Sequence, residues 1–351
     1  MNNVTDTFIS LCSIASPSGR EARVSEYILK RLAPYVTDEV HVDAAGNIYV
    51  SESGYGEPLL LCAHIDTVEP AGDQVPVVKD DVVYSDGQGV LGADDKSAVA
   101  AMLEAYIHIK TSGKAHRAFE ILFTVREETD GGLREFSRKK IKSSTALIAD
   151  ISLPIGTIVT AAPYVSGYAV TATAPGGHVG RITKDTIHPL HFFQAFARTF
   201  PPRKTRNTIT NIAIVRMGES YNSVPQSIYF TGEIRTFSQK EHDTFMQSIQ
   251  QKVRELDVRF GTKSSIELFP YCVGYQLTKA HVAHTKKILQ RAGHEVVTQG
   301  VYSVGDFNIL AEWGITPINI GNGAREVHTT HEHISIASLT SLYEIIISHL
   351  Y

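Results

Sequence analysis

Residues 59–67 read Leu-Leu-Leu-Cys-Ala-His-Ile-Asp-Thr, an apolar run of strand length that ends abruptly in His64 and Asp66. In an extended strand, residues two apart point to the same face, so the imidazole and the carboxylate would lie together. A buried strand does not normally place two such groups on one face without a ligand or a partner. The pair therefore predicts either a metal site, with His64 as ligand and Asp66 behind it, or a simple His–Asp pair at the strand end.

The composition describes a soluble globular protein. The 351 residues are 43% hydrophobic and 20% charged, which suits one large domain or two ordinary ones. The net charge of -4 gives no reason to expect a nucleic acid or an acidic membrane as partner. The three cysteines form no Cys-x-x-Cys pair, no signal peptide is apparent, and no apolar run reaches the length of a membrane span. We therefore expect a cytoplasmic protein without a disulfide framework or a thiolate zinc site.

The first part of the chain alternates strand-like and helical segments. Apolar runs at 59–64, 118–125 and 146–149 are separated by helical spacing, most clearly over 97–109. This order predicts an α/β domain with a mostly parallel sheet flanked by helices, in which ligands gather at the carboxyl ends of the strands. Polar residues stand where these runs end, or in the glycine-rich loop 85–96: His64, Asp66, Asp94, Glu127, Glu128 and Asp150.

The pattern changes after about residue 163. Expected strands at 166–173, 208–217, 228–235 and 264–269 alternate with helices at 187–200 and 241–258, which suits a small α+β domain with an antiparallel sheet. From about residue 271 the character of the first domain resumes and a helix at 335–350 closes the chain. The expected organisation is a catalytic domain of residues 1–163 and 271–351, interrupted by an inserted domain of residues 164–270.

The polar residues at the expected sheet edge form a plausible ligand set. They comprise His64, Asp94, Glu128, Asp150 and one histidine of the cluster at 328–333. Nitrogen and carboxylate ligands without thiolates suit catalytic zinc, with cobalt or manganese as substitutes. Five ligands exceed what one catalytic zinc takes and suit two metals that share a carboxylate. The alternative is a sheet edge held by ion pairs alone.

The adjacent glutamates Glu127 and Glu128 are expected to have different roles. Neighbouring side chains on an extended backbone face opposite ways, so both cannot easily bind the same metals. One of the two would bind metal, and the other would stay free as a general base that deprotonates water and protonates a leaving amine.

Taken together, these motifs resemble those of the di-zinc metallopeptidases that include peptidase T, carboxypeptidase G, aminoacylase and succinyl-diaminopimelate desuccinylase. The resemblance rests on His64-Ile-Asp66, Leu91-Gly-Ala-Asp-Asp-Lys96, Arg126-Glu-Glu128, Ala149-Asp150 and a late histidine, in this order. It covers essentially the whole chain and is closest to the peptidase T-like branch. It implies a zinc-peptidase-like α/β fold in which the inserted domain is a lid or dimerisation domain.

The resemblance also assigns roles to single residues. Asp94 would bridge two zinc ions, with a cis Asp94–Asp95 peptide. His64 and Asp150 would complete one site, and Glu128 and His328 the other, with Asp66 orienting His64 and Glu127 as general base. His328 is preferred because the family's ligand stands four residues before a glutamate, here Glu332; His331 remains the alternative.

In the inserted domain, His178 resembles a lid histidine that reaches the active site of the partner subunit in a homodimer. Asn222 and Arg235 resemble substrate-binding residues, and the guanidinium of Arg235 suits a carboxylate; a structural salt bridge is the alternative. One departure concerns Ser303-Val-Gly-Asp306, which lacks the arginine that peptidase T carries near the equivalent glycine–aspartate pair.

We therefore expect a zinc-dependent aminopeptidase that acts on small peptides. An N-acyl-amino-acid deacylase or a carboxypeptidase with the same chemistry is the first alternative, and N-acyl amino acids would then be the substrates. A non-catalytic metal-binding protein is the second, although a structural metal site would not need the spare base Glu127.

Overall fold

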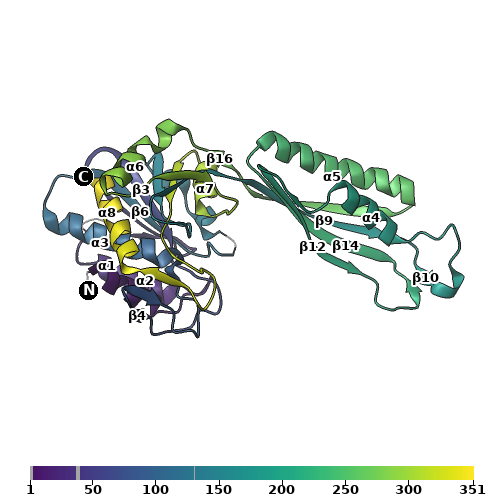
Figure 1. The fold of residues 1–351 in the computed structure, drawn as a ribbon, viewed down its shortest axis with the longest axis horizontal. Coiled ribbons are helices and arrows are strands. Elements are labelled where there is room, and N and C mark those ends of the chain that lie inside the picture. Colours follow the sequence, from purple (N-terminus) through teal and green to yellow (C-terminus); the bar gives the residue numbers. More distant parts are fainter. Residues whose placement is uncertain (1–2, 37–39, 130) are drawn as a thin grey trace. The chain divides into compact units, whose positions relative to one another are not determined.

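The computed structural model describes residues 3–36, 40–129 and 131–351. The chain divides into two compact units, one made of residues 1–160 and 277–351 and the other of residues 161–276 (Figure 1). Within the described ranges, no helix is both long enough and apolar enough to cross a membrane.

A central sheet organises the first unit. Its strands run in the order β1-β2-β6-β3-β7-β18-β8, and β17 also pairs with β8. The four central strands β6, β3, β7 and β18 are parallel, as predicted, whereas β2 and β8 pair with them antiparallel. The strands are β1 (His41–Val42), β2 (Ile48–Glu52), β3 (Tyr55–His64), β6 (Arg117–Thr124), β7 (Thr145–Ile148), β8 (Thr157–Ala162), β17 (Val297–Gly300) and β18 (Thr316–Ile320).

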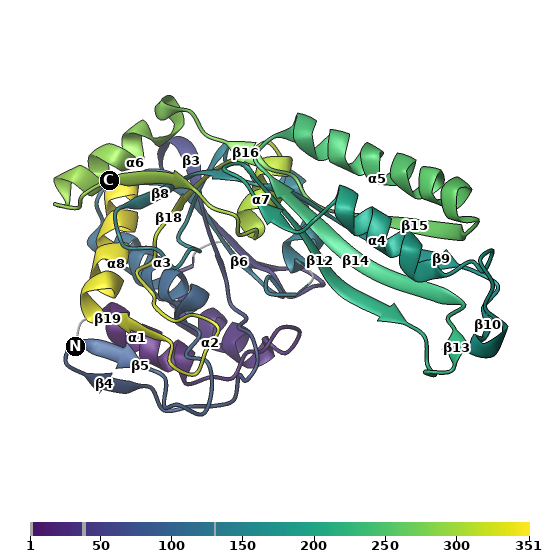
Figure 2. The same ribbon diagram turned by 45° about the vertical axis from the view of Figure 1, so that its right-hand side comes forward.

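Helices cover this sheet and share its core. Helix α3 packs on β3, with α1 and α8 beside it (Figure 2). Leu59, Leu61 and Ala63 of β3 join this core because alternate residues of a strand face the same layer. The helices are α1 (Asn3–Cys12), α2 (Ala22–Leu32), α3 (Ala93–Ser112), α6 (Lys279–Arg291), α7 (Asp306–Glu312) and α8 (Ile336–Leu350), with 3₁₀ turns η1 (Gly132–Glu135) and η2 (Arg138–Lys140). A small sheet holds β4 (Val77–Lys79), β5 (Val82–Tyr84) and β19 (His333–Ser335).

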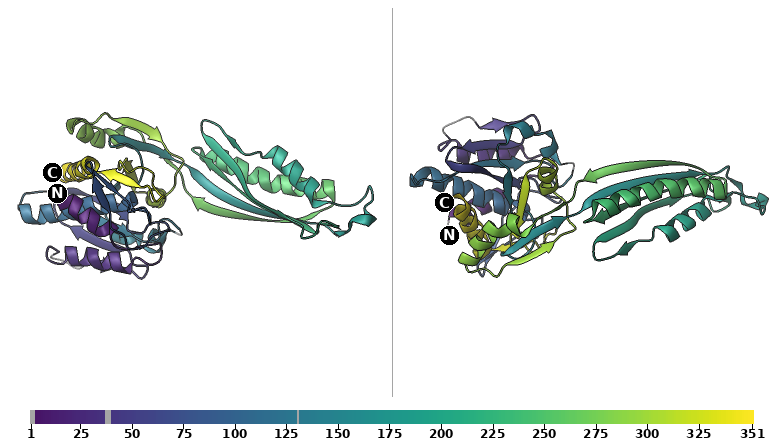
Figure 3. Two further views of the ribbon diagram at one scale, coloured as in Figure 1. Left: turned by 60° about the horizontal axis from the view of Figure 1, so that its bottom comes forward. Right: turned by 90° about the horizontal axis from the view of Figure 1, so that it is seen from above.

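The second unit is a five-stranded antiparallel sheet in the order β11-β12-β14-β9-β15, as the α+β pattern predicts. Helices α4 (Pro189–Thr199) and α5 (Gln239–Phe260) lie on one face of it (Figure 3). Phe192, Phe196 and Phe230 are fully buried between the helices and the sheet. The strands are β9 (Tyr164–Thr173), β11 (Arg203–Lys204), β12 (Thr208–Met217), β14 (Ser227–Thr236) and β15 (Lys263–Cys272); smaller elements are β10 (Gly177–His178), η3 (Val179–Arg181), β13 (Ser223–Val224) and β16 (Tyr275–Gln276).

One buried histidine makes the stability of the first unit depend on pH. His349 of α8 is 5% exposed; its Nδ1 lies 2.8 Å from the carbonyl oxygen of Ile345, and its Nε2 lies 3.0 Å from the Thr285 hydroxyl. Burial of the imidazole lowers the pKa of His349 to about 4. An unfolded histidine titrates near pH 6.5. Between these two values the unfolded chain binds a proton that the folded chain does not, so stability is lost as the pH falls from 6.5 towards 4.

We expect His349→Gln to flatten this dependence. Glutamine does not titrate and still has an amide to pair with Thr285 and the helix carbonyl. The wild type should lose about 2 kcal/mol more than the variant between pH 7 and pH 5. Urea unfolding of both proteins in chelator, at several pH values, measures the difference. Parallel curves for the two proteins would show that His349 does not control this loss.

Candidate metal centre

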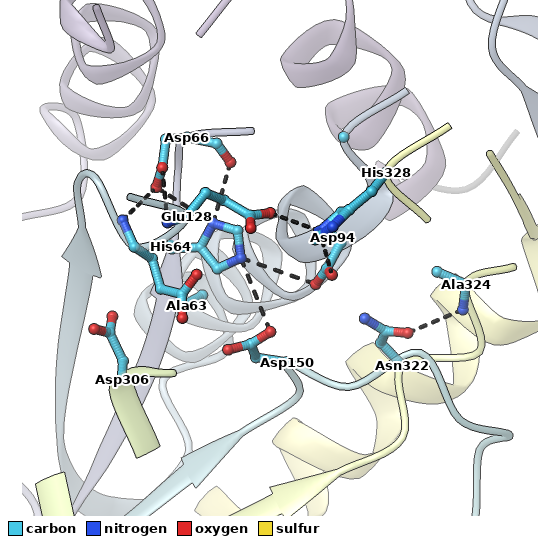
Figure 4. A network of polar contacts seen from close by, with 12 residues as sticks. Ala63, His64, Asp66, Asp94, Glu128, Asp150, Asp306, Asn322, Ala324 and His328 are labelled. Carbon is cyan, nitrogen blue, oxygen red and sulfur yellow. Dashed lines mark hydrogen bonds and ion pairs between the residues drawn. The ribbon is translucent and has the colours of Figure 1, made fainter. Parts of the chain in front are cut away.

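Five of the residues expected to bind metal come together at the carboxyl ends of the parallel strands. Among the described residues, three groups have ligand atoms that all lie within 4.8 Å of one another; His64, Glu127 and Glu128 form one, and the other two both contain Asp94. Of the two that contain Asp94, one is His64, Asp94 and Asp150, and the other is Asp94, Glu128 and His328. Figure 4 shows these side chains pointing towards one another. The sharing of Asp94 is the arrangement that two neighbouring metals with one common carboxylate require.

Three of the four nitrogen–oxygen distances in this cluster are longer than a hydrogen bond. His64 Nε2 lies 3.8 Å from Asp94 Oδ1 and 3.9 Å from Asp150 Oδ1, and His328 Nε2 lies 2.9 Å from Glu128 Oε1 and 3.6 Å from Asp94 Oδ2. Asp94 Oδ1 and Glu128 Oε1 are buried and accept no hydrogen bond of good geometry. Buried, unsatisfied carboxylate oxygens are costly. A divalent cation between nitrogen and oxygen donors would satisfy them, so the residues fit a metal.

The start of α3 positions the shared carboxylate. Gly92 has a φ of 74°, a left-handed conformation that glycine adopts without strain, and Asp94 departs from helical geometry. The Asp94–Asp95 peptide is cis, as the family resemblance implies. The carboxylate of Glu332 accepts the Gly92 N–H at 2.6 Å and the Asp94 N–H at 3.1 Å. The side chain of Glu332 therefore holds two backbone amides of the turn that presents Asp94.

The expectation that Glu127 and Glu128 face opposite ways is wrong. Both glutamates have carboxylate oxygens within 4.8 Å of a His64 ring nitrogen and of each other. The physical reason is that β6 ends at Thr124 and Arg126 has a φ of 55°, so the backbone is not extended here. A positive φ at a non-glycine residue is a strained conformation that recurs at functional sites. Glu127 belongs to neither of the groups that contain Asp94, which leaves it the freer of the two.

Asp66 fixes this turn as well as the ring of His64. Its two carboxylate oxygens accept the N–H groups of Glu127 and Glu128 at 3.0 and 3.2 Å, and Ser18 donates its hydroxyl at 2.6 Å. His64 Nδ1 lies 3.1 Å from the backbone oxygen of Asp66 and 3.4 Å from its carboxylate. Such partners orient a ligating histidine.

The structure distinguishes the two candidate late histidines. His328 lies in the Asp94 group and has a φ of 63°. His331 is exposed and occurs in none of the ligand groups found among the described residues. The geometry therefore favours His328 as the ligand.

The electrostatics of the cluster reflect burial and crowded charge. Burial raises the pKa of Glu127 and of Asp150 well above the usual carboxyl range. Burial lowers the pKa of His64, but neighbouring carboxylates outweigh it and hold that pKa well above its ordinary value. The neighbouring carboxylates of Asp94 and Glu128 raise the pKa of His328 to about 10. Carboxylates outnumber the two imidazoles, so the site attracts cations.

Several supporting residues are not predicted from the sequence. Asn319 of β18 clamps Asp150, because its Oδ1 accepts the Asp150 N–H and its Nδ2 donates to the Asp150 carbonyl, both at 3.1 Å. Thr124 donates its hydroxyl to buried Asp306 at 2.5 Å, and burial raises the pKa of Asp306 to about 6. Strand pairing and loop packing create these contacts, which the sequence does not reveal. Of these supporting residues, only Asp306 is noted from the sequence, as part of the Gly305–Asp306 pair of the family resemblance.

The remaining candidate residues lie in the second unit. His178 is exposed, and its Nδ1 accepts the Gly180 N–H at 3.1 Å. Asn222 is exposed, and its side-chain oxygen accepts the hydroxyl of Ser220 at 2.6 Å. Arg235 forms an ion pair with Glu233 at 3.0 Å, which is the salt bridge considered as an alternative to substrate contact.

Two relatives match much of the chain in sequence. YqjE of Bacillus subtilis (strain 168), described as uncharacterized, is 25% identical over 98% of this chain and 96% of its own length. Peptidase T of Haemophilus influenzae (strain PittGG) is 24% identical over 77% of this chain, and the match spans 66% of that protein.

Solved structures share the fold. Aminopeptidase PepT from Bacillus cereus superposes with a TM-score of 0.94 at 23% identity, covering 99% of this chain and 97% of that one. A tripeptidase from Staphylococcus aureus gives a TM-score of 0.93 at 24% identity with the same coverage. The model of peptidase family M20/M25/M40 matches residues 60–350, which is most of the sequence. This chain therefore belongs to peptidase family M20/M25/M40.

Proposed function

We propose that this chain is a di-zinc aminopeptidase that cleaves small peptides. The observation that carries the proposal is the pair of ligand groups that share Asp94, with Glu127 beside them but outside both. The relatives named peptidase T, aminopeptidase and tripeptidase support a peptide substrate with a free amino terminus.

The ligand set supports zinc. His64, Asp94 and Asp150 would hold one ion, and Asp94, Glu128 and His328 the other; cobalt or manganese are possible substitutes. When bound, the two ions would act as Lewis acids on the scissile carbonyl and lower the pKa of water.

The residues of the chain supply proton transfer and alignment. Glu127 would accept a proton from the attacking water and donate it to the nitrogen of the departing amine. Asp66 holds the backbone of Glu127 and Glu128 through two amide hydrogen bonds. These bonds would fix the position of the general base relative to the neighbouring metal ligand. The hydroxyl of Ser18 supports Asp66 from the N-terminal segment.

Gly305 gives this alignment a direct test. A Cβ at position 305 would lie 2.6 Å from Glu127 Oε1 and 3.0 Å from Asp150 Oδ2. Gly305→Ala should therefore displace the carboxylate of Glu127 and lower kcat by about tenfold to a hundredfold, because small misplacements of reacting groups cost that much. Steady-state kinetics with metal analysis measure the effect. Gly72→Ala is the matched control, since no heavy atom lies within 4 Å of its Cβ position. Unchanged kcat in Gly305→Ala would mean that Glu127 is not confined there.

We infer that residues 164–270 form a lid that also makes a homodimer. His178 would donate a hydrogen bond to the oxyanion of the reacting peptide in the partner subunit's site. Asn222 and Arg235 would bind the substrate, with the guanidinium of Arg235 facing its carboxylate. His178→Ala should then lower kcat and leave the zinc content unchanged. Mixed dimers of His178→Ala and Glu127→Gln chains that are more active than either variant alone would support action across the interface; no recovery of activity would refute it.

The first measurement is metal content together with turnover of a substrate panel. The panel holds dipeptides and tripeptides, the same peptides with blocked amino termini, and N-acetyl amino acids. About two zinc ions per chain and turnover confined to peptides with free amines would support the proposal. Turnover of only acylated substrates would replace it with a deacylase. If the protein bound no metal and showed no turnover after reconstitution with zinc, the proposed function would be refuted.

We also place the protein in the cytoplasm. Support comes from Cys12 and Cys62, which are buried thiols outside any disulfide. Recovery of the protein from an extracellular or envelope fraction would contradict this location.

A further inference from the structure

Glu332 is a buried carboxylate that joins two segments carrying proposed metal ligands. It lies four residues after His328, in the loop that leads into β19, and its side chain is 0% exposed. Oε2 accepts the Gly92 N–H at 2.6 Å and Oε1 accepts the Asp94 N–H at 3.1 Å. Each oxygen thus takes one backbone amide of the turn that presents Asp94.

The backbone of Glu332 is fixed independently. Its N–H donates to the carbonyl of Thr329 at 3.2 Å, and its carbonyl accepts the N–H of Ser85 at 3.1 Å. The charge of Lys96, 2% exposed, also acts on this carboxylate. Burial of a carboxylate is costly unless hydrogen bonds and opposite charge offset it. Glu332 is therefore a rigid link between the His328 loop and the start of α3.

We propose that Glu332 is a positioning residue that sets the distance between Asp94 and His328, and so the metal affinity of the site formed by Asp94, Glu128 and His328. The inference rests on the proposed metal centre. The other site needs this link less, because His64 ends strand β3 and Asp150 is clamped to β18 by Asn319. Asp94 is common to both sites, whereas His328 belongs to one.

Glu332→Gln tests the link with almost no change of shape. The amide oxygen of glutamine can accept one of the two N–H groups, but its NH₂ faces the other as a second donor. Loss of a residue that orients ligands typically lowers metal affinity tenfold to a hundredfold. We expect a loss of that size for one of two zinc ions in calorimetric titration of the full-length apoprotein.

Single-site backgrounds show where the loss falls. With His64→Ala, which leaves the site of Asp94, Glu128 and His328, Glu332→Gln should weaken zinc binding by the full factor. His328→Ala leaves only the site of His64, Asp94 and Asp150. In that background Glu332→Gln should weaken zinc binding by less than about threefold, because the link to His328 is already lost and the two changes are not additive. Equal losses in the two backgrounds, or none in either, would overturn the inference.

Glu120→Gln is the matched control. Glu120 is 1% exposed and accepts the N–H groups of Lys142 and Ser143 at 2.9 Å each, but it belongs to none of the ligand groups. Glu120→Gln should lower thermal stability and leave the zinc affinities of both sites unchanged. If Glu332→Gln does not fold, Glu332→Asp keeps the charge at a shorter reach and should show the same pattern at smaller size. Wild-type protein that binds no zinc would instead refute the metal centre itself.

Discussion

Glu127→Gln is expected to lower kcat by about a thousandfold and to leave the zinc content at the wild-type level. Glutamine keeps the shape of the side chain but cannot accept a proton from water. Glu127 lies outside both groups that share Asp94, so its loss removes no proposed ligand. The measurements are metal analysis and steady-state kinetics with a small peptide. We expect kcat to fall, while KM and the zinc content stay at the wild-type values.

The neighbouring residue provides the control. Glu128→Gln is the same chemical change one position along the chain, but it removes a ligand from the group of Asp94 and His328. It should lose metal as well as activity. Burial and like charges disfavour an ionised Glu127, so Glu127→Gln should melt in chelator at or above the wild-type temperature. Loss of zinc from Glu127→Gln would make Glu127 a ligand, and retained activity would remove its role as base.

The convergence of the candidate ligands could be anticipated from the sequence. His64, Glu128 and Asp150 each follow an apolar run, and the runs became the parallel strands β3, β6 and β7. Parallel strands bring their carboxyl ends to one edge, so strand order alone places these residues together. Two observations carry most of the fold: the alternation of strands with helices, and the change of pattern near residue 163.

The local geometry of the site could not be anticipated in the same way. The different facing of Glu127 and Glu128 was expected from an extended backbone, yet a single positive φ at Arg126 turns both towards His64. One residue in a rare conformation overrides the periodicity on which such a prediction depends.

The supporting residues leave even less trace in the sequence. Asp66 and Glu332 belong to sequence motifs, but the backbone amides that they hold do not, and Asn319 belongs to no motif at all. Ligand residues can be recognised because only a few side chains bind metal. Their partners become visible only when the fold brings distant segments together, as it does for Glu332 and Asp94.

Asp94→Asn is expected to remove both metals together. Asp94 is the one residue shared by the two ligand groups, and the amide nitrogen of asparagine does not bind zinc. Each site would keep two ligands from the chain. Zinc content should fall from about two ions per chain to well below one, and peptidase activity should fall to background. Stabilisation by zinc should disappear as well; at a hundred times Kd it would amount to about 2.7 kcal/mol in the wild type.

Asp95→Asn separates this effect from the loss of a buried charge. Asp95 is fully buried beside Asp94, and burial raises the pKa of its carboxyl well above the usual range, but it occurs in no ligand group. A neutral amide is therefore a mild change at position 95, and the variant should bind both zinc ions and gain thermal stability from them. Loss of only one ion in Asp94→Asn would mean that the two sites do not share this carboxylate, because a bridging ligand cannot be removed from one metal alone.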